Sequence, residues 1–406
     1  MMGFNNNFRS FAGSTLYYRV MSIVLLIVGI LLFIGLVVVH EYGHFLMARR
    51  NGVVVEEFGI FFPPRLFKYK TKAGWNFTIN ALPLGGFVKL KGEHDTDTEP
   101  GSFGAASLGA KSKIMIAGVA MNLIVALVML TALAAIGMPK LIPNQFTLKS
   151  DTKISRQEVL ASYVEPGSPA AQAGLKSEDR IIQIGSTASK VTNSDELVKL
   201  TKHYAGQAIA VTYAHAGQVK QAQITLRTTA EVEASKKTDS PKGYLGIAPT
   251  EYVLQRSTWS APVVAVGLSA QLTQLTFQGL GHALSGLGSI FAGAATGNTP
   301  ARQHGQTAAS SQVSGPVGIF VVLKNGSALG YQFMLLIIAI ISLTLAIMNI
   351  LPIPALDGGR LWITLITRAI KRPLSPKREE AINLAGFATL MLLIIAITVV
   401  DVRRFF

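Results

Sequence analysis

The sequence predicts an α-helical polytopic membrane protein with four transmembrane helices and one inserted α+β domain. Half of the 406 residues are hydrophobic and only 15% are charged, which is too apolar for a soluble protein of this length. Four long apolar segments occur along the chain. Between the second and the third lies a polar region with strand-like alternation, long enough to form a separate domain.

The first apolar segment, residues 21–39, contains no charged residue and reaches the roughly 20 residues that a helix needs to cross a bilayer. A secretory signal is the alternative, but its apolar region would be shorter and would end at a small-residue cleavage site. Here the segment continues directly into HEYGH, so we expect a retained transmembrane helix. The other three spans are expected at about residues 114–136, 333–351 and 384–400.

Basic residues gather in the connection between the first two spans and in the connection between the last two. By the positive-inside rule both connections are cytoplasmic, so both chain ends and the inserted domain are expected on the outer side. The net charge of +15 would also suit nucleic acid, but no basic stripe with interleaved aromatic residues occurs, so membrane lipid is the expected partner and nucleic acid is not. The chain has no cysteine, which excludes disulfide bonds and thiolate metal sites.

The motif HEYGH, residues 40–44, is the first candidate for chemistry. On a helix His40 and His44 share one face and can bind one metal ion, while Glu41 stays close enough to act on a water molecule. Arg49 lies nine residues beyond His40, or about 13 Å of helix at roughly 1.5 Å per residue, so His40 should lie below the membrane surface. Ionisable groups at that depth are costly and functional by default, although the histidines could instead satisfy a buried hydrogen-bond network.

Two histidines leave a catalytic zinc ion short of its usual three protein ligands. The outstanding third ligand in the apolar segments is Asp357, in NILPIPALDGGR at residues 349–360. Spans one and three are expected to cross the bilayer in the same direction, which brings Asp357 to the depth of His44. Pro352, Pro354 and the glycine pair after Asp357 are expected to interrupt the helix, which is tolerated where a broken helix lines a cavity or is buried in protein. A proline-kinked structural span with an unpaired aspartate is the alternative.

Residues 262–295 form an apolar segment that is interrupted by glutamines and glycines. If this segment crossed the membrane, Asp357 would lie on the opposite face from His44, so a shared metal site forbids the crossing. We therefore expect an amphipathic helix at the outer surface. Residues 297–314 are expected to form a loop, and His282 and His304 to be ordinary polar positions.

The polar middle region is expected to fold as one small β-rich domain, since strand-like runs alternate with turn signals between residues 155 and 229. EPGSPAAQAGLKSEDRIIQIGS, residues 165–186, resembles a PDZ domain, in which a short helix, a glycine and an Asp-Arg-Ile strand recur in this order. GYLGI, residues 243–247, looks like a closing strand that follows such domains in membrane proteases, although it could equally form a PDZ ligand loop. A PDZ-shaped spacer that binds nothing is the alternative to a domain with a peptide ligand.

Five features occur together along the chain: HEYGH at the end of the first span, GGFVKL at residues 85–90, the PDZ-like insertion, SGPVGI at residues 314–319, and NILPIPALDGG. Together they resemble the bacterial site-2 protease family, regulator of sigma-E protease type, with a single PDZ domain, and the likeness covers nearly the whole chain. The resemblance implies that His40, His44 and Asp357 bind Zn2+ and that Glu41 is the general base. It further implies substrate-binding roles for Asn349, Gly86 and Phe87.

The function implied by the resemblance is that of an intramembrane zinc metalloprotease of the bacterial inner (plasma) membrane. Its substrates would be transmembrane segments of single-span membrane proteins, an anti-sigma factor or a remnant signal peptide, with the PDZ-like domain as size gate or sensor. The resemblance adds a membrane-associated β-hairpin or sheet to the fold class. One departure is visible, because the family commonly has AGP before an asparagine where this chain reads AGVAMN, residues 117–122, and this puts the local bend of the second span in doubt.

The expected division of the chain follows from these features. It comprises the N-terminus and first transmembrane helix (1–50), a cytoplasmic and membrane-dipping β region (51–113), the second transmembrane helix (114–138), the PDZ-like domain with its closing strand (150–250), the amphipathic surface helix and loop (255–315), the third transmembrane segment (330–370) and the fourth transmembrane helix (383–402).

Two other functions compete with the protease. A membrane-anchored PDZ adaptor with a structural zinc site would have no use for a base at Glu41. A metal-ion carrier would need ionisable residues spread through several spans, yet the second and fourth spans contain none between their flanks. For the protease, NFTINALPLGGFVKL could supply a sheet edge against which an unwound substrate strand pairs.

Overall fold

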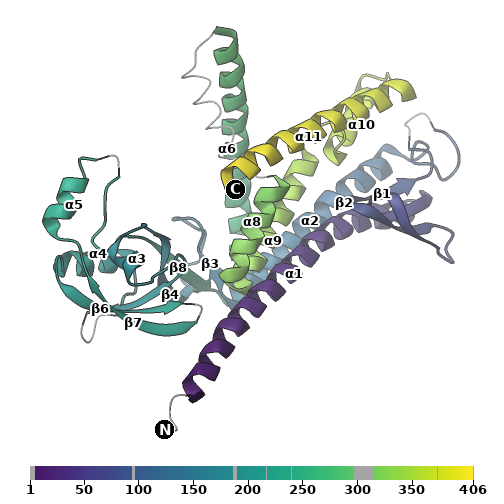
Figure 1. The fold of residues 1–406 in the computed structure, drawn as a ribbon. Helices are drawn as coiled ribbons and strands as arrows, with labels where there is room; N and C mark the ends of the chain where they lie inside the picture. Colours follow the sequence, from purple (N-terminus) through teal and green to yellow (C-terminus); the bar gives the residue numbers. More distant parts are fainter. Residues whose placement is uncertain are drawn as a thin grey trace. The chain divides into compact units, whose positions relative to one another are not determined.

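The computed structural model describes residues 5–93, 97–185, 190–215, 217–238, 240–296, 315–372 and 374–405. The chain divides into two compact units (Figure 1). One unit comprises Met1–Val24 and Ala134–Ala261, and the other comprises Leu25–Leu133 and Pro262–Phe406.

The second unit is mainly helical. Among the described residues, four helices are long and apolar enough to cross a membrane, namely α2, α9, α11 and the part of α1 from Val20 to Arg50, and they agree with the four predicted spans. Many apolar side chains on their outer faces are exposed, as expected for contact with lipid. The elements that lie mainly in this unit are α1 (Asn5–Arg50), β1 (Val55–Lys70), β2 (Asn76–Leu90), α2 (Leu108–Ile136), α6 (Ala261–Thr296), α8 (Pro316–Ala328), α9 (Tyr331–Ile350), α10 (Asp357–Ala369) and α11 (Pro376–Phe405).

The strands β1 and β2 pair antiparallel, and each folds back on the other. Residues 57–60 of β1 pair with residues 76–79 at the start of β2 on one side, and residues 55–60 pair with residues 86–90 at its end on the other. The end of β1, residues 65–70, pairs with residues 76–80 as well. The sheet is therefore four arms wide, and the arm at residues 86–90 forms one of its edges.

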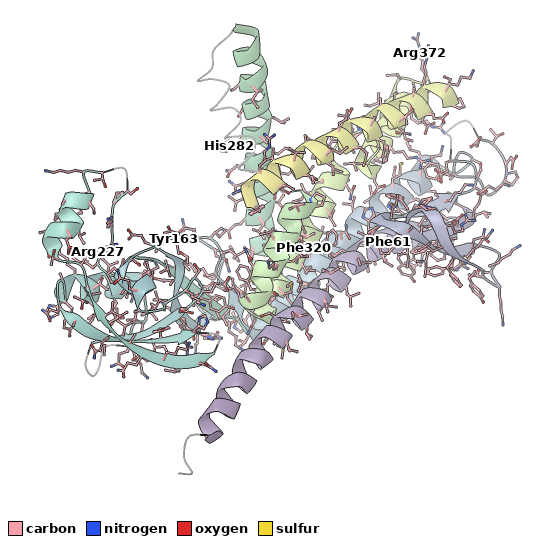
Figure 2. The ribbon with its side chains drawn as sticks, in the orientation of Figure 1. Phe61, Tyr163, Arg227, His282, Phe320 and Arg372 are labelled. Carbon is pink, nitrogen blue, oxygen red and sulfur yellow. The ribbon has the colours of Figure 1, made fainter. Side chains whose placement is uncertain are left out.

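Helix α6 forms where the amphipathic helix was predicted. In its first third, Leu268 is buried and Leu272 packs against a cluster formed by Ala126 of α2 with Leu343 and Ile347 of α9. Its location at the membrane surface stays a prediction. His282 is exposed on this helix (Figure 2), whereas His304 and the predicted loop at residues 297–314 lie outside the described residues.

The helix break around NILPIPALDGG differs in one respect from the prediction. The break covers residues 351–356 and contains both prolines, but Gly358 and Gly359 lie inside α10. A side chain at Gly358 would lie 2.5 Å from the carbonyl oxygen of Ile350, and one at Gly359 would collide with the backbone of Ile353. The glycine pair therefore lets α10 fold back closely against the loop instead of ending the helix.

Helix α8 was not predicted. It begins within the SGPVGI motif, and its Phe320 is labelled in Figure 2. The buried carboxylate of Asp401 on α11 accepts hydrogen bonds of 2.8 Å from the backbone N–H groups of Gly315 and Gly318. A carboxylate at the positive end of a helix satisfies N–H groups that have no partner inside it, so α11 supplies the cap that α8 lacks.

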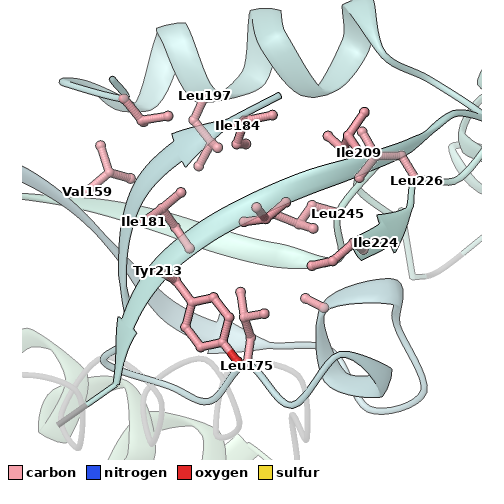
Figure 3. Packing of buried hydrophobic residues seen from close by; sticks show 13 residues of the cluster. Val159, Leu175, Ile181, Ile184, Leu197, Ile209, Tyr213, Ile224, Leu226 and Leu245 are labelled. Carbon is pink, nitrogen blue, oxygen red and sulfur yellow. The ribbon is translucent and has the colours of Figure 1, made fainter. Parts of the chain in front are cut away.

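The first unit holds a six-stranded sheet in the order β3-β8-β4-β5-β6-β7. Apolar residues from its strands and from α4 form one core, in which Val159, Ile181 and Leu197 are almost fully buried (Figure 3). This agrees with the predicted small β-rich domain, whose likeness to a PDZ domain stays a prediction. Its elements are β3 (Met138–Pro139), β4 (Lys153–Val164), α3 (Pro169–Gln172), β5 (Arg180–Ile184), α4 (Ser194–His203), β6 (Ala208–His215), β7 (Gln218–Thr225), α5 (Thr229–Ser235) and β8 (Ile247–Arg256).

The closing strand lies later than GYLGI suggested. Only Ile247 of that motif belongs to β8, and residues 243–246 form the turn that leads into it. Gly246 has a φ of +79°, which favours glycine, and its carbonyl accepts a hydrogen bond from Glu165 N–H. The strand then runs along β4 as far as Arg256.

Asp151, in the turn before β4, caps the start of α6. Its carboxylate accepts hydrogen bonds from the Ser260 hydroxyl at 2.6 Å, from Thr258 N–H at 2.7 Å and from Ser260 N–H at 3.1 Å. These hydrogen bonds hold the pKa of the Asp151 carboxyl well below its usual range, because they favour the ionised form. The bond from the Ser260 hydroxyl has the largest effect. Since the folded-state pKa is the lower one, the stabilisation is complete above the unfolded-state pKa and is lost as the pH falls toward the folded-state pKa.

We therefore expect Asp151→Ala to lower the melting temperature at pH 7, and its difference from the wild-type chain to shrink below about pH 4. Thermal melts of both chains at pH 7 and pH 3 check this. Equal melting temperatures at pH 7 would show that the cap contributes nothing.

Candidate metal and catalytic site

The HEYGH motif lies on α1, and its two imidazoles face each other. Nε2 of His40 and Nε2 of His44 are 3.2 Å apart, and both side chains are buried. His44 Nδ1 is 2.8 Å from the carbonyl oxygen of Ile114 on α2, and a carbonyl can only accept a hydrogen bond. Nδ1 of His44 therefore carries the proton, and its Nε2 keeps a free lone pair.

Asp357, the first residue of α10, completes the cluster. Its Oδ2 lies 2.9 Å from His40 Nε2 and 3.1 Å from His44 Nε2, although 313 residues separate His44 from Asp357. Among the described residues these three side chains form a group that could hold a metal ion. Asp357 therefore lies within reach of both histidines, and the role of the three residues as metal ligands stays a prediction.

The spacing of the three atoms fits zinc. Ligand atoms at about 2.0–2.1 Å from a tetrahedral Zn2+ lie roughly 3.3 Å from one another. The observed separations of 2.9, 3.1 and 3.2 Å are close to one triangular face of such a tetrahedron. Three protein ligands leave the fourth position for water or substrate, as in catalytic rather than structural zinc sites.

Asn122 of α2 gives a second test of the fit. Its Nδ2 lies 3.2 Å from His40 Nδ1, while its buried Oδ1 has no hydrogen-bond partner among the described residues. Amide oxygen and nitrogen are assigned from the hydrogen-bond network, and exchanging them turns Oδ1 toward His40 Nδ1. Oδ1 then accepts a hydrogen bond from the N–H at His40 Nδ1, and the lone pair of His40 Nε2 is free for a metal.

Replacing Asn122 with Ala should lower the affinity for Zn2+ by about 10- to 100-fold, the usual effect of losing a partner that orients a ligand. Asn122→Asp keeps an acceptor oxygen and should bind zinc more tightly than the alanine variant. Competition with a chelator of known affinity measures both. An unchanged affinity in Asn122→Ala would mean that the amide does not orient His40.

Glycines allow α1 and α2 to meet at the site. A Cβ at Gly43 would lie 2.6 Å from the carbonyl oxygen of Ala117, and a Cβ at Gly118 would lie 2.7 Å from His40 Nε2. Real Cβ atoms essentially never come so close. Gly43 faces backbone and therefore requires glycine at this helix separation, whereas a side chain at Gly118 would displace the imidazoles. The helix pair is thereby close enough for α2 to contact both imidazoles.

Glu41 lines a cavity of about 180 Å³ together with His44 and Asp357, which we call the catalytic-site cavity. Gly86 and Phe87 of the edge arm line it too, and the backbone N–H of Val88 hydrogen-bonds the Glu41 carboxylate. A Cβ at Gly86 would lie 3.0 Å from Glu41 Cγ, so the glycine lets the strand pass beside the carboxylate. Asn349, near the end of α9, is not among the described residues that line this cavity.

Sequence reasoning missed three residues at this site. Asn122 and Gly118 belong to the AGVAMN segment, which was noted only for its missing proline. Arg360 also lines the catalytic-site cavity, and its place one helical turn after Asp357 was the signal for it.

Apolar helices of membrane-spanning length and a His-His-Asp cluster beside a glutamate define a class, the membrane metalloproteases with a catalytic zinc centre. Comparison with known sequences gives the family. The chain belongs to Peptidase family M50, the site-2 proteases, whose profile matches residues 28–393.

Similar proteins agree with this assignment. A Clostridium perfringens protein with zinc metalloprotease in its name is 30% identical over 377 residues, covering 93% of this chain and 98% of its own. Zinc metalloprotease RasP of Shouchella clausii is 26% identical over 462 residues, covering 94% and 99%. An Enterococcus faecalis protein named as protease eep is 24% identical over 463 residues, also covering 94% and 99%. The protein is thus an integral membrane zinc metalloprotease of the site-2 type, and its metal is Zn2+.

Proposed function

We propose that this protease hydrolyses peptide bonds within the membrane, in transmembrane segments of single-span proteins, with His40, His44 and Asp357 as its zinc ligands. The observation that carries the proposal is the convergence of their three ligand atoms, all within 4.8 Å of one another. Two of the ligands lie on α1, a helix of membrane-spanning length, and the third follows α9, another such helix. A hydrolytic centre at that place has transmembrane segments within reach.

The chain's own residues supply the proton transfers and the orientation. Zn2+ bound at the three ligands provides a Lewis acid that polarises a carbonyl and makes water nucleophilic near neutral pH. Glu41 takes the proton of the attacking water at its carboxylate and passes it to the leaving nitrogen. The hydrogen bond from Val88 N–H fixes the Glu41 side chain, while Ile114 and Asn122 fix the two imidazoles.

A transmembrane substrate must be unwound before attack, because its carbonyls are engaged in helical hydrogen bonds. Among the described residues, the edge arm at residues 86–90 has a strand neighbour on one side only, and its other side lies beside the catalytic-site cavity. An unwound strand can pair there with the backbone groups that Glu41 and Glu93 do not already engage. Gly86 and Phe87 would then contact the substrate directly. Asn349 is proposed as a further substrate contact on the strength of the family motif alone.

Proline disrupts the pairing of a strand, so Phe87→Pro should displace the edge arm from the catalytic-site cavity, slow cleavage by about tenfold or more and leave zinc bound. Lys68→Pro on the arm at the opposite edge of the sheet is the matched control, and it should retain most of the activity. Cleavage rates of a single-span reporter and zinc content per chain are measured for both. Equal rates for the two variants would remove the edge arm from the mechanism.

The six-stranded domain is proposed to regulate access as an extracytoplasmic PDZ-like domain. A groove of about 330 Å³ lies between α4 and the turn into β8, and three lysines line it. Beside the groove, the first part of β8 has no strand on its outer edge among the described residues, because β3 pairs only with its end. A peptide with a free carboxylate could add there as a strand, with Lys202 and Lys242 near its end. A spacer that binds no peptide remains the alternative for this domain.

The proposed location is the bacterial inner (plasma) membrane, with both chain ends and the PDZ-like domain outside and the zinc site toward the cytoplasmic side. The clusters of Lys and Arg between spans one and two and between spans three and four support this orientation. The proposed substrates are anti-sigma factors or remnant signal peptides. Membrane proteomics with an inactive chain should identify them as accumulating uncleaved fragments.

The direct test is cleavage of a single-span reporter by the purified chain in liposomes. We expect products cut inside the apolar segment of the reporter, lost on chelation and restored by Zn2+, with the cut position read by mass spectrometry. The competing function is a membrane-anchored PDZ adaptor with a structural zinc site. An intact reporter in the presence of the zinc-loaded chain would favour the adaptor.

A further inference from the structure

Arg360 is the only lysine or arginine among the described residues that line either cavity beside Asp357. It lines the catalytic-site cavity with Glu41 and His44. It also lines a second cavity of about 440 Å³, which is bordered by the α11 residues Glu380 and Asn383. One guanidinium thus lies at the boundary of two cavities that share Asp357.

The surroundings of Arg360 hold its side chain in place. The guanidinium carbon lies 4.5 Å from the centre of the Phe103 ring, and that ring is only 2% exposed. One guanidinium N–H donates to the backbone oxygen of Glu93, whose side chain in turn accepts a hydrogen bond of 2.9 Å from Leu90 N–H. The guanidinium is thus held by the buried Phe103 ring and, through Glu93, by the end of β2 at Leu90. The position of the cation is fixed before any ligand binds.

The positive charge of Arg360 is only partly compensated. The nearest approach of its Nη1 to the Glu93 carboxylate is 3.7 Å, and that carboxylate is 40% exposed. A loose, solvated ion pair of this kind contributes little. Arginine has five N–H groups in a planar fork that matches a carboxylate, and the backbone of Glu93 takes one of them.

Peptide hydrolysis produces a carboxylate where the cavity already holds negative charge. Water adds to the carbonyl carbon, the C–N bond breaks, the leaving nitrogen gains a proton as an amine, and the acyl fragment ends as a carboxylate. Glu41 and Asp357 both line the catalytic-site cavity, and Glu380 lines the neighbouring one. A new anion beside these carboxylates is costly at low dielectric unless a cation lies within reach. Zn2+ bound at the site would be one such cation, and Arg360 is the only lysine or arginine among the described residues that line the two cavities.

We propose that Arg360 binds the carboxylate of the acyl product and is thereby a substrate-contacting residue of the reaction. This inference rests on the proposed function for the origin of the carboxylate. The binding itself depends on the fixed guanidinium, so it can be measured without turnover.

The probe is N-acetyl-trileucine as the free acid, compared with its carboxamide. Dissociation constants are measured by calorimetry on the full chain in detergent, first stripped of metal by a chelator and then loaded with Zn2+. In the stripped wild-type chain we expect the acid to bind about 10- to 100-fold more tightly than the amide, as for charge-assisted bonds to a fork. Removing the metal matters because Zn2+ would itself attract a carboxylate.

Arg360→Gln should abolish the preference for the acid, and Arg360→Lys should retain part of it, since lysine keeps the charge and loses the fork. Arg368→Gln, on the exposed side of the same helix, is the matched control and should keep the full preference. A stripped wild-type chain without preference, or an Arg360→Gln chain that keeps it, would overturn the proposal. Zinc uptake by the variants shows that they are folded. If Arg360→Gln does not fold, the test is whether Arg360→Lys retains only part of the preference for the acid.

The liposome cleavage assay separates this inference from the proposed function. If the chain prefers the acid through Arg360 but cuts no reporter, the anion site is supported and the proposed protease function is contradicted. Cleavage inside the reporter by a chain without the preference would do the reverse.

Discussion

Replacing Glu41 with Gln is expected to abolish turnover while zinc stays bound. The carboxylate lines the catalytic-site cavity but does not belong to the cluster of His40, His44 and Asp357, so its loss removes no ligand. Glutamine has nearly the same size and can still accept the hydrogen bond from Val88 N–H. It cannot take a proton from water, and losing a general base typically slows a reaction by about 10²- to 10⁴-fold.

Two measurements check this expectation, namely reporter cleavage in liposomes and zinc per chain by atomic absorption. Glu99→Gln is the control, because Glu99 is exposed and forms a surface ion pair with Lys91. His44→Ala should lose both zinc and activity, which places the two functions of the HEYGH motif on different side chains. A Glu41→Gln chain with more than a tenth of the wild-type rate would show that Glu41 is not the base.

The cluster of His40, His44 and Asp357 could be predicted because each of its two motifs is recognisable within a short stretch of sequence. Two histidines four apart on a helix must share a face, and an aspartate in an apolar segment needs a partner. The contacts of Asn122 and of Ile114 with the imidazoles could not be predicted, since they depend on how closely α2 approaches α1. The spacing of residues along one helix does not determine the distance between that helix and another.

The fold shows the same limit. Composition predicts the four spans because a helix that crosses a membrane must be long and apolar throughout. It does not predict that residues 55–60 pair with both ends of β2, because either pairing satisfies the same strand pattern. Helix α8, with 13 residues, is too short for a span, and its cap comes from Asp401, more than 80 residues away.

Gly118→Ala is expected to separate zinc binding from stability. In a helix interior, alanine is favoured over glycine by about 1 kcal/mol, so backbone preference alone would make the variant more stable. The added methyl group, however, would lie 2.7 Å from both Nε2 and Cε1 of His40 and would also collide with His44 Nε2. The imidazoles must therefore move, and a site whose ligand atoms are 2.9–3.2 Å apart cannot keep its geometry when they do.

We expect the zinc affinity of Gly118→Ala to fall by about 100-fold or more, beyond the effect of losing one orienting partner. Separating the helices would relieve the collision only by losing the close contact of Gly43 with Ala117 at the same crossing. Gly109→Ala is the matched control, since a side chain at Gly109 on α2 meets nothing within 4 Å. That variant should keep its zinc, and in chelator both variants should melt at or above the wild-type temperature. A Gly118→Ala chain that binds Zn2+ with wild-type affinity would mean that α2 does not shape the site.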